Sequence, residues 1–155
     1  MSIAENIAKL GLTLPTVAAP AANYLPYQFS NGHLYLSGQL PKDSEGHMTV
    51  GQLGAKVSVE EGKKAARVCG INMIGAINAA VNGDWSRVKK IVKITCFVSS
   101  SPDFSEQHVV ANGCSDLLVE VFGKDIGCHA RCAVGMAQLP LNASVEIDAI
   151  VEVSP

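Results

Sequence analysis

The C-terminal quarter of the chain holds an arginine and a glutamate whose side chains could bind and hydrolyse a small anion. Arg131 stands in one strand-like segment and Glu146 in the next. A guanidinium grips a carboxylate through two parallel hydrogen bonds, and a carboxylate can orient a water molecule. The Leu139–Asn142 segment between them contains a proline and an asparagine, which favour a turn from one strand to another. The two side chains could then meet across a sheet or across a subunit boundary.

Local signals predict the elements that must position these side chains. The spacing Ser-x-x-Glu at positions 2 and 58 predicts a helix start at each, and Asn-Gly at 31–32 predicts a hairpin turn. Periodicity predicts helices over 3–10, 59–80 and 104–122, strands over 27–30, 33–37, 91–98 and 145–153, a linker over 13–22 and a surface loop over 42–56. With a strand at Arg131, the order is ββαβαββ after an N-terminal helix. This order predicts an α+β sandwich with two long helices on one face of the sheet.

Composition narrows the classes of partner. The chain has 155 residues, with Lys+Arg 12 against Asp+Glu 14, so no basic field attracts a phosphate backbone and we expect no nucleic-acid partner. Its length fits one domain, 1–155, with the N-terminal helix and linker over 1–20 and the core over 21–155. The five cysteines show no metal-binding or disulfide spacing, and no apolar run is long enough to span a bilayer. We expect a cytoplasmic protein with no membrane partner, no metal and no cofactor.

Two segments of the chain carry a family resemblance. The first runs from Leu25 to Pro41, with Leu-Pro-Tyr followed by Tyr-Leu-Ser-Gly-Gln-Leu-Pro. The second combines Arg131, Val134, Leu-Pro at 139–140 and Val-Glu-Ile-Asp-Ala at 145–149. At this spacing they resemble the Rid/YjgF family of reactive intermediate imine deaminases, also labelled endoribonuclease L-PSP-like. The resemblance spans roughly residues 20 to 153 and implies a chorismate-mutase-like fold and a homotrimer with clefts between subunits.

The resemblance implies roles for five residues. Arg131 would clamp the substrate carboxylate, and Glu146 would position or polarise the attacking water. Tyr27, Ser37 and Gly38 match positions that lie near the substrate. Each also has an ordinary interpretation: a surface arginine, a solvated glutamate on an acidic strand face, a packed ring, and a capping serine with a turn glycine.

The family asparagine is harder to assign. Asn112 matches it if the preceding helix contains about one extra turn, whereas His108 matches without a gap. The former alignment puts Ser115 where a tyrosine is common. His129 is either a proton shuttle or polar surface. Cys132 lies on the opposite strand face from Arg131 and is expected to be a small buried residue, with a reactive thiol as the less favoured alternative.

These roles imply an enamine/imine deaminase, a hydrolase that converts reactive 2-imino acids to 2-keto acids and ammonia without a cofactor. The substrate would be a small carboxylate-bearing molecule. One alternative is a non-catalytic, carboxylate-metabolite-binding or regulatory trimer that uses the same arginine. A less favoured alternative is an endoribonuclease, because the chain has no basic groove with exposed aromatic residues.

Overall fold

A computed structural model describes residues 1–17 and 22–155. Its elements are α1 (Ile3–Lys9), β1 (Tyr27–Ser30), β2 (His33–Gln39), α2 (Val59–Ala80), β3 (Val88–Ser99), α3 (Gln107–Gly127), β4 (Ala130–Met136) and β5 (Val145–Val153), with single 3-10 turns at Trp85–Arg87 and Pro140–Asn142. The predicted ββαβαββ order after an N-terminal helix is therefore confirmed. The predicted linker over 13–22 lies partly outside the described residues.

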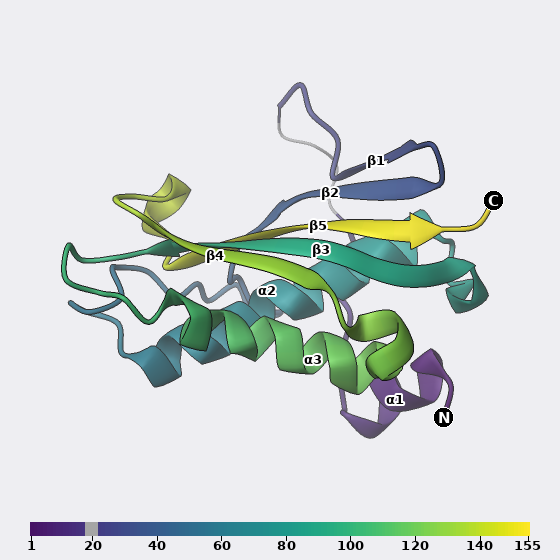
Figure 1. Cartoon of the computed structure of the whole chain (residues 1–155), viewed down its shortest axis with the longest axis horizontal. Helices are drawn as coiled ribbons and strands as arrows, with labels where there is room; N and C mark the ends of the chain where they lie inside the picture. The colour runs from purple at the N-terminus through teal and green to yellow at the C-terminus, as the bar shows by residue number, and fades with distance from the viewer. Residues whose placement is uncertain (18–21) are drawn as a thin grey trace.

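The strands form one sheet in the order β1-β2-β5-β3-β4. All neighbouring strands are antiparallel except β3 and β4, which are parallel and are joined through α3. Figure 1 shows α2 and α3 side by side on one face of the sheet, with α1 against α3. No helix of residues 1–17 and 22–155 lies on the other face, as predicted for this α+β sandwich.

The local signals act as predicted at the two Ser-x-x-Glu sites. The Ser58 hydroxyl accepts from the Glu61 amide (3.2 Å), and the Glu61 carboxylate accepts from the Ser58 amide (2.8 Å). Ser2 and Glu5 form the same reciprocal pair at α1. At the predicted hairpin, Asn31 and Gly32 both have positive φ, which a type I′ turn requires.

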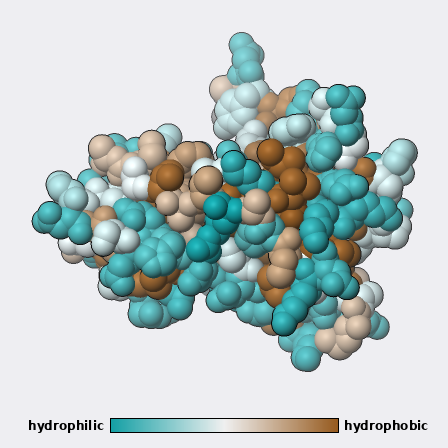
Figure 2. All heavy atoms as spheres, viewed as in Figure 1, coloured by the Kyte–Doolittle hydropathy of each residue, from teal (hydrophilic) through white to brown (hydrophobic). Residues whose placement is uncertain are grey.

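The core lies between the sheet and the two long helices. In β5, alternate residues from Val145 to Val153 are buried, while Glu146 and Asp148 point to the face without helices. Large hydrophobic side chains nevertheless remain exposed, and Figure 2 shows hydrophobic atoms at several places among hydrophilic ones on the side it presents. The exposed set is Met1, Tyr24, Leu25, Phe29, Tyr35, Val50, Val134, Met136 and Leu141.

Several element boundaries differ from the prediction, most clearly in β3 and α3. β3 starts at Val88, because the chain enters the strand directly from the turn at Trp85–Arg87. α3 starts at Gln107 and its helical dihedrals break at Gly123 (φ 75°, ψ 167°), where the sequence predicts its end, before one more turn follows. No helix of the described residues is long and apolar enough to cross a membrane.

Candidate functional site

Arg131 is held against α3 by three acceptors. It lies near the start of β4 and is half-buried. Its Nη1 donates to Asn112 Oδ1 (2.8 Å) and to Ser115 Oγ (3.1 Å), and its Nη2 donates to the His108 carbonyl oxygen (3.2 Å). The guanidinium is thus fixed in place by the protein itself.

The helical repeat explains why α3 can supply all three acceptors. His108, Asn112 and Ser115 are four and then three positions apart, so they share one stripe of the helix. Of the two candidates for the family asparagine, only Asn112 reaches Arg131 with its side chain. The His108 side chain makes no hydrogen bond to Arg131, and only its backbone carbonyl takes part.

The position of α3 relative to α2 depends on a close approach at Gly113. A Cβ added there would lie 2.8 Å from the Lys63 carbonyl carbon. Only glycine fits this distance without moving a helix, because backbone rather than a flexible side chain stands opposite. Gly113 therefore sets how closely α3 packs against α2.

Ser115 connects Arg131 to His129. The Ser115 Oγ lies 2.9 Å from His129 Nε2, and His129 Nδ1 lies 2.6 Å from the Gly127 carbonyl oxygen. The sequence analysis left His129 as either a proton shuttle or polar surface. The structure places it half-buried and hydrogen-bonded on both ring nitrogens, so it is not simple polar surface.

A second group of candidate residues lies where β2 meets β5. The Glu146 carboxylate sits directly over Gly38, where a Cβ would lie 2.8 Å from Glu146 Cδ. The Ser37 hydroxyl donates to the Leu25 carbonyl oxygen (2.6 Å). Partial burial raises the pKa of Glu146 above its ordinary value, and the Asp148 carboxylate raises it further.

The two groups lie on opposite faces of the sheet. Arg131 pairs with Ile94, which pairs with Ala149, and both of these residues are buried beneath the helices. Glu146 is an odd number of positions from Ala149, so its side chain points to the face without helices. β4 and β5 are also separated by β3, which puts them about 10 Å apart at the usual strand spacing. Arg131 and Glu146 of one chain therefore do not meet.

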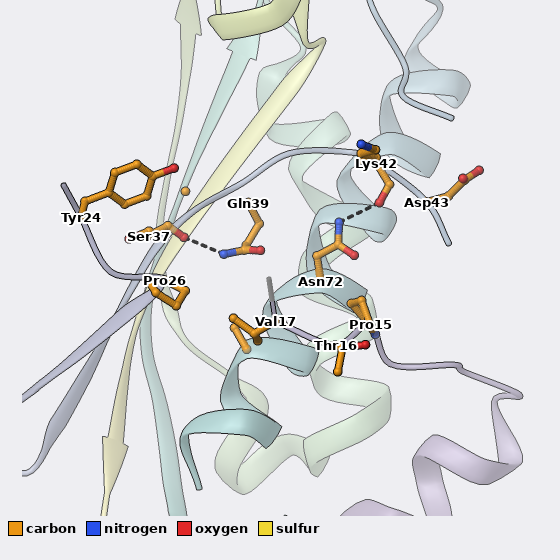
Figure 3. A pocket seen from close by; sticks show the side chains of 12 residues that line it. Pro15, Thr16, Val17, Tyr24, Pro26, Ser37, Gln39, Lys42, Asp43 and Asn72 are labelled. Carbon is orange, nitrogen blue, oxygen red and sulfur yellow. Dashed lines mark hydrogen bonds between the residues drawn. The ribbon is translucent and has the colours of Figure 1, made fainter. Parts of the chain in front are cut away.

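Two cavities lie near these residues, and Glu146 lines neither of them. A shallow cavity of about 250 Å³ at Arg131 is lined by Ser115, Asp116, Val119, Cys128 and His129. A larger one of about 380 Å³ lies beside Ser37 and Gly38, between β2, α2 and the segment around Pro15. In Figure 3, Asn72 points from α2 toward Lys42 and donates to its carbonyl oxygen (3.0 Å).

Tyr27 lies away from both Arg131 and Glu146. It is a half-buried residue of β1 and pairs with Leu36 of β2. Its ring packs edge-on against that of Phe29, with ring centroids 6.0 Å apart. It also contacts the core. Within one chain these contacts account for the ring as strand packing, and its place near a substrate stays a prediction.

The cysteines divide into three buried and two exposed. Cys69, Cys96 and Cys114 are buried, and burial raises the pKa of the Cys96 thiol to about 12, which makes it unreactive. Cys132 is exposed, so the expectation that it is buried was wrong. Its neighbours across the sheet are Thr95 and Asp148, on the face that no helix covers.

Comparisons with known proteins agree with this architecture. A family model described as "YjgF/chorismate_mutase-like, putative endoribonuclease" matches residues 5–153. "Protein TCP17" of Trypanosoma cruzi is 53% identical, covering 98% of this chain and 94% of its own length. "Putative regulator AldR" of Lactococcus lactis is 32% identical, covering 90% of this chain and 96% of its own length.

Solved structures are similar over nearly the whole chain. The Agrobacterium tumefaciens protein Atu1372, of unknown function, is 47% identical with a TM-score of 0.89 and covers 98% of this chain and 94% of that one. A protein from Shewanella oneidensis described as a putative endoribonuclease is 33% identical with a TM-score of 0.92 and covers 99% and 100%. With its fold, its Arg131 and Glu146 segments and these matches, the chain belongs to the YjgF/chorismate mutase-like, or Rid, family.

Proposed function

We propose that this protein is an enamine/imine deaminase that hydrolyses 2-imino acids to 2-keto acids and ammonia. The proposal rests on which N–H groups of the Arg131 guanidinium already have an acceptor and which do not. Three of its N–H groups are engaged by α3. The Nε–H and the second Nη2–H have no acceptor among residues 1–17 and 22–155, and two donors of this kind can grip one carboxylate.

The position of this donor pair favours a small ligand. The cavity at Arg131 holds about 250 Å³, and its lining includes Val119, Ser115 and His129. A 2-imino acid with a short side chain would place its carboxylate on Arg131 and its imine carbon one bond away. Free imines already react with water, so positioning the two reactants supplies much of the acceleration.

We further propose that the site is completed by a second copy of the chain in a homotrimer. Glu146 lies on the opposite sheet face from Arg131 within one chain, so only a neighbouring subunit can bring it to the same substrate. Exposed Tyr35, Val134 and Met136 lie on that same face and offer the apolar surface that a subunit contact would bury. Glu146, Ser37 and Gly38 of one subunit would then face Arg131 of the next.

In this arrangement Glu146 orients the attacking water. Partial burial raises its pKa, and its oxygens can accept a hydrogen bond from that water. Gly38 supports this role because its missing side chain leaves room for the carboxylate. Asn112 contributes by holding Arg131, and its amide does not need to touch the substrate.

The test is release of ammonia from imino acids generated in situ by an amino-acid oxidase. Wild type should accelerate release over the buffer rate, and Arg131→Ala should abolish the acceleration while the protein remains folded. Arg67→Ala is the matched control, because Arg67 makes only an exposed ion pair with Glu120 (3.7 Å). Equal rates for wild type, Arg131→Ala and buffer would exclude the deaminase.

A second candidate is a carboxylate-binding regulator without turnover, because a relative that is 32% identical carries the name of a regulator. The same arginine would hold the ligand in both cases. Calorimetry with a 2-keto acid separates the two: binding that depends on Arg131, from a protein that releases no ammonia, would favour the regulator. An endoribonuclease has less support, because the net charge of -2 provides no attraction for RNA.

A further inference from the structure

The hydrogen bonds at His129 fix where its protons are. A carbonyl oxygen can only accept, so the 2.6 Å contact with the Gly127 oxygen places the proton on His129 Nδ1. In a neutral imidazole Nε2 is then the acceptor, so the Ser115 hydroxyl donates to it across 2.9 Å. Ser115 Oγ in turn accepts from Arg131 Nη1 (3.1 Å). The chain of donors therefore runs in one direction, from Arg131 through Ser115 to His129.

His129 is in its neutral form at neutral pH. Burial lowers its pKa below the ordinary value, and the Arg131 guanidinium lowers it further, which outweighs the opposite effect of the Gly127 carbonyl. Besides Arg131 and His129, the ionisable groups that line this cavity are Asp116 of α3 and Cys128, which directly precedes His129. His129 is thus ready to accept a proton from Ser115.

Ser115 has one hydrogen-bonding position left for a ligand. A hydroxyl has one donor and two acceptor positions, of which the donor goes to His129 and one acceptor position to Arg131. The second acceptor position is not used by any described residue. Because Ser115 lines the cavity at Arg131, this position can face a bound molecule or a water.

We propose that Ser115 and His129 form a proton relay for imine hydrolysis at Arg131. The inference rests on the proposed deaminase function and adds two catalytic groups to it. Ser115 would contact the reacting water or nitrogen, and His129 would store the proton. Ser115, His129 and Arg131 line one cavity, so a molecule or a water held there can contact the Ser115 hydroxyl.

The relay keeps the reaction balanced. Water adds to the carbon of the 2-iminium acid, its oxygen forms the new C–O bond, and the C=N electron pair moves to nitrogen. The water proton passes to Ser115 while the Ser115 proton passes to His129 Nε2. The imidazolium then returns this proton through Ser115 to the amine, the C–N bond breaks, and the carbonyl forms. Ammonia leaves with the hydroxyl proton as ammonium, and His129 is neutral again.

A purely structural role explains the arrangement less well. Asn112 Oδ1 and the His108 carbonyl already hold Arg131. Ser115 could serve as the third acceptor whether or not a histidine stood at position 129. His129 makes no hydrogen bond to Arg131, and its half-buried ring beside a permanent cation is electrostatically unfavourable once protonated. An apolar side chain would fill this position at no such cost.

Two variants test the relay in the ammonia-release assay with the full-length protein. His129→Gln can still accept a hydrogen bond from Ser115 but cannot take a proton, and Ser115→Ala breaks the connection. Both should lower kcat by about 100-fold, the usual loss for one proton-transfer group. His129→Gln should keep KM within about twofold of wild type, whereas Ser115→Ala should also raise KM because it removes an acceptor from Arg131. Ser115→Thr should restore most of kcat, because it restores the hydroxyl.

The pH profile and a matched histidine complete the test. Wild-type activity should fall at low pH as His129 becomes protonated, and His129→Gln should lose this fall. His33→Gln is the control. Like His129, His33 has its Nδ1 beside the carbonyl oxygen of the residue two positions earlier, that of Asn31 (3.0 Å), but it lies in β2, three strands from β4 and Arg131. Variants with unchanged kcat and pH profile, or with raised KM alone, would overturn the relay while leaving the deaminase intact. An inactive wild type would overturn both.

Discussion

Arg131 is oriented before any ligand binds. The Asn112 amide and the Ser115 hydroxyl hold Nη1, and the His108 carbonyl holds Nη2, so the guanidinium plane does not have to be ordered when a carboxylate arrives. Such preorganisation reduces the entropy lost on binding. The arrangement also needs a planar fork, since the same side chain must satisfy α3 and the ligand at once.

Arg131→Lys should therefore be a severe substitution despite the conserved charge. A lysine ammonium has three donors and cannot both satisfy the acceptors on α3 and bind a carboxylate bidentately. The expected loss in kcat/KM is about 10- to 100-fold, corresponding to about 1.5 to 3 kcal/mol for one charged hydrogen bond. Steady-state ammonia release measures it. A kcat/KM within twofold of wild type would mean that only the charge matters.

Glu146 should make stability depend on pH in a defined direction. Its pKa is raised by partial burial and then by Asp148, so the folded state holds the proton more tightly than the unfolded state. The resulting stabilisation is present below the ordinary glutamate pKa and is lost as pH rises through the raised folded value. Glu146→Gln should therefore have a higher Tm than wild type at neutral pH, and the difference should vanish at low pH.

A pH series of thermal melts checks this sign. Asp148→Asn is the companion variant, because it removes only the smaller cause of the raised pKa and should reduce the pH dependence without abolishing it. A Tm difference between Glu146→Gln and wild type that stays constant from acid to neutral pH would show that ionisation of Glu146 is not involved.

Sequence reasoning named Arg131, Asn112, Ser115 and His129 but did not predict that Ser115 connects Arg131 to His129. Arg131 and Asn112 were predictable from their motif and from helical spacing. The Ser115–His129 contact depends on how the turn after α3 brings the chain back, which no local pattern encodes. A signal was present in retrospect: His129 is two positions before Arg131, so in an extended segment both side chains point the same way. Cys132 was misjudged because β4 is an edge strand with one uncovered face.

Helices and the hairpin were the most predictable elements, because their signals are local. The two capping boxes and the Asn-Gly turn occur where the sequence places them. The strand order was not predictable in this way. β5 inserts between β2 and β3, and β4 lies at the edge parallel to β3, so the position of Arg131 follows from long-range pairing. The opposite-face placement of Arg131 and Glu146 follows from the same pairing.

The close approach of α3 to α2 can be tested at Gly113. Gly113→Ala would place a Cβ against the Lys63 backbone, so α3 must shift, and the expected destabilisation is about 1 to 3 kcal/mol. Because Asn112 and Ser115 move with the helix, kcat/KM should fall as well. Gly135→Ala is the matched control, since the atom nearest to its Cβ is Gln107 Nε2 (2.9 Å), at the end of a flexible side chain. Equal losses of Tm in both variants would contradict the argument.

The two capping boxes should differ in their importance. Ser58→Ala removes the cap of α2, which lies in the core, and should cost about 1 kcal/mol, or roughly 2 to 4 °C in Tm. Ser2→Ala weakens only α1, a helix of 7 residues with no buried side chain. Differential scanning calorimetry should therefore show a smaller shift for Ser2→Ala. A larger shift for Ser2→Ala would mean that α1 stabilises α3 more than its contacts indicate.

The positions of Arg131 and Glu146 in the whole molecule lead to a prediction about assembly. Each residue, with the groups around it, is called a half-site. Arg131 lies on the helix side of edge strand β4, while Glu146 lies over Gly38 on the face without helices. If the proposed deaminase needs both residues at one substrate, two chains must supply them. In a closed ring each subunit would present its Arg131 half to one neighbour and its Glu146 half to the other, which satisfies cyclic symmetry.

Mixing two inactive variants tests this directly. In a trimer built from Arg131→Ala and Glu146→Ala chains, every mixed ring contains one interface where an intact Arg131 meets an intact Glu146. Random 1:1 assembly makes about three quarters of the rings mixed, with one intact site in three, so about a quarter of wild-type activity should return. Co-refolding the two variants and measuring ammonia release would show it, with each variant refolded alone as the blank. If the two residues acted within one chain, mixing would restore nothing, because no chain in the mixture carries both.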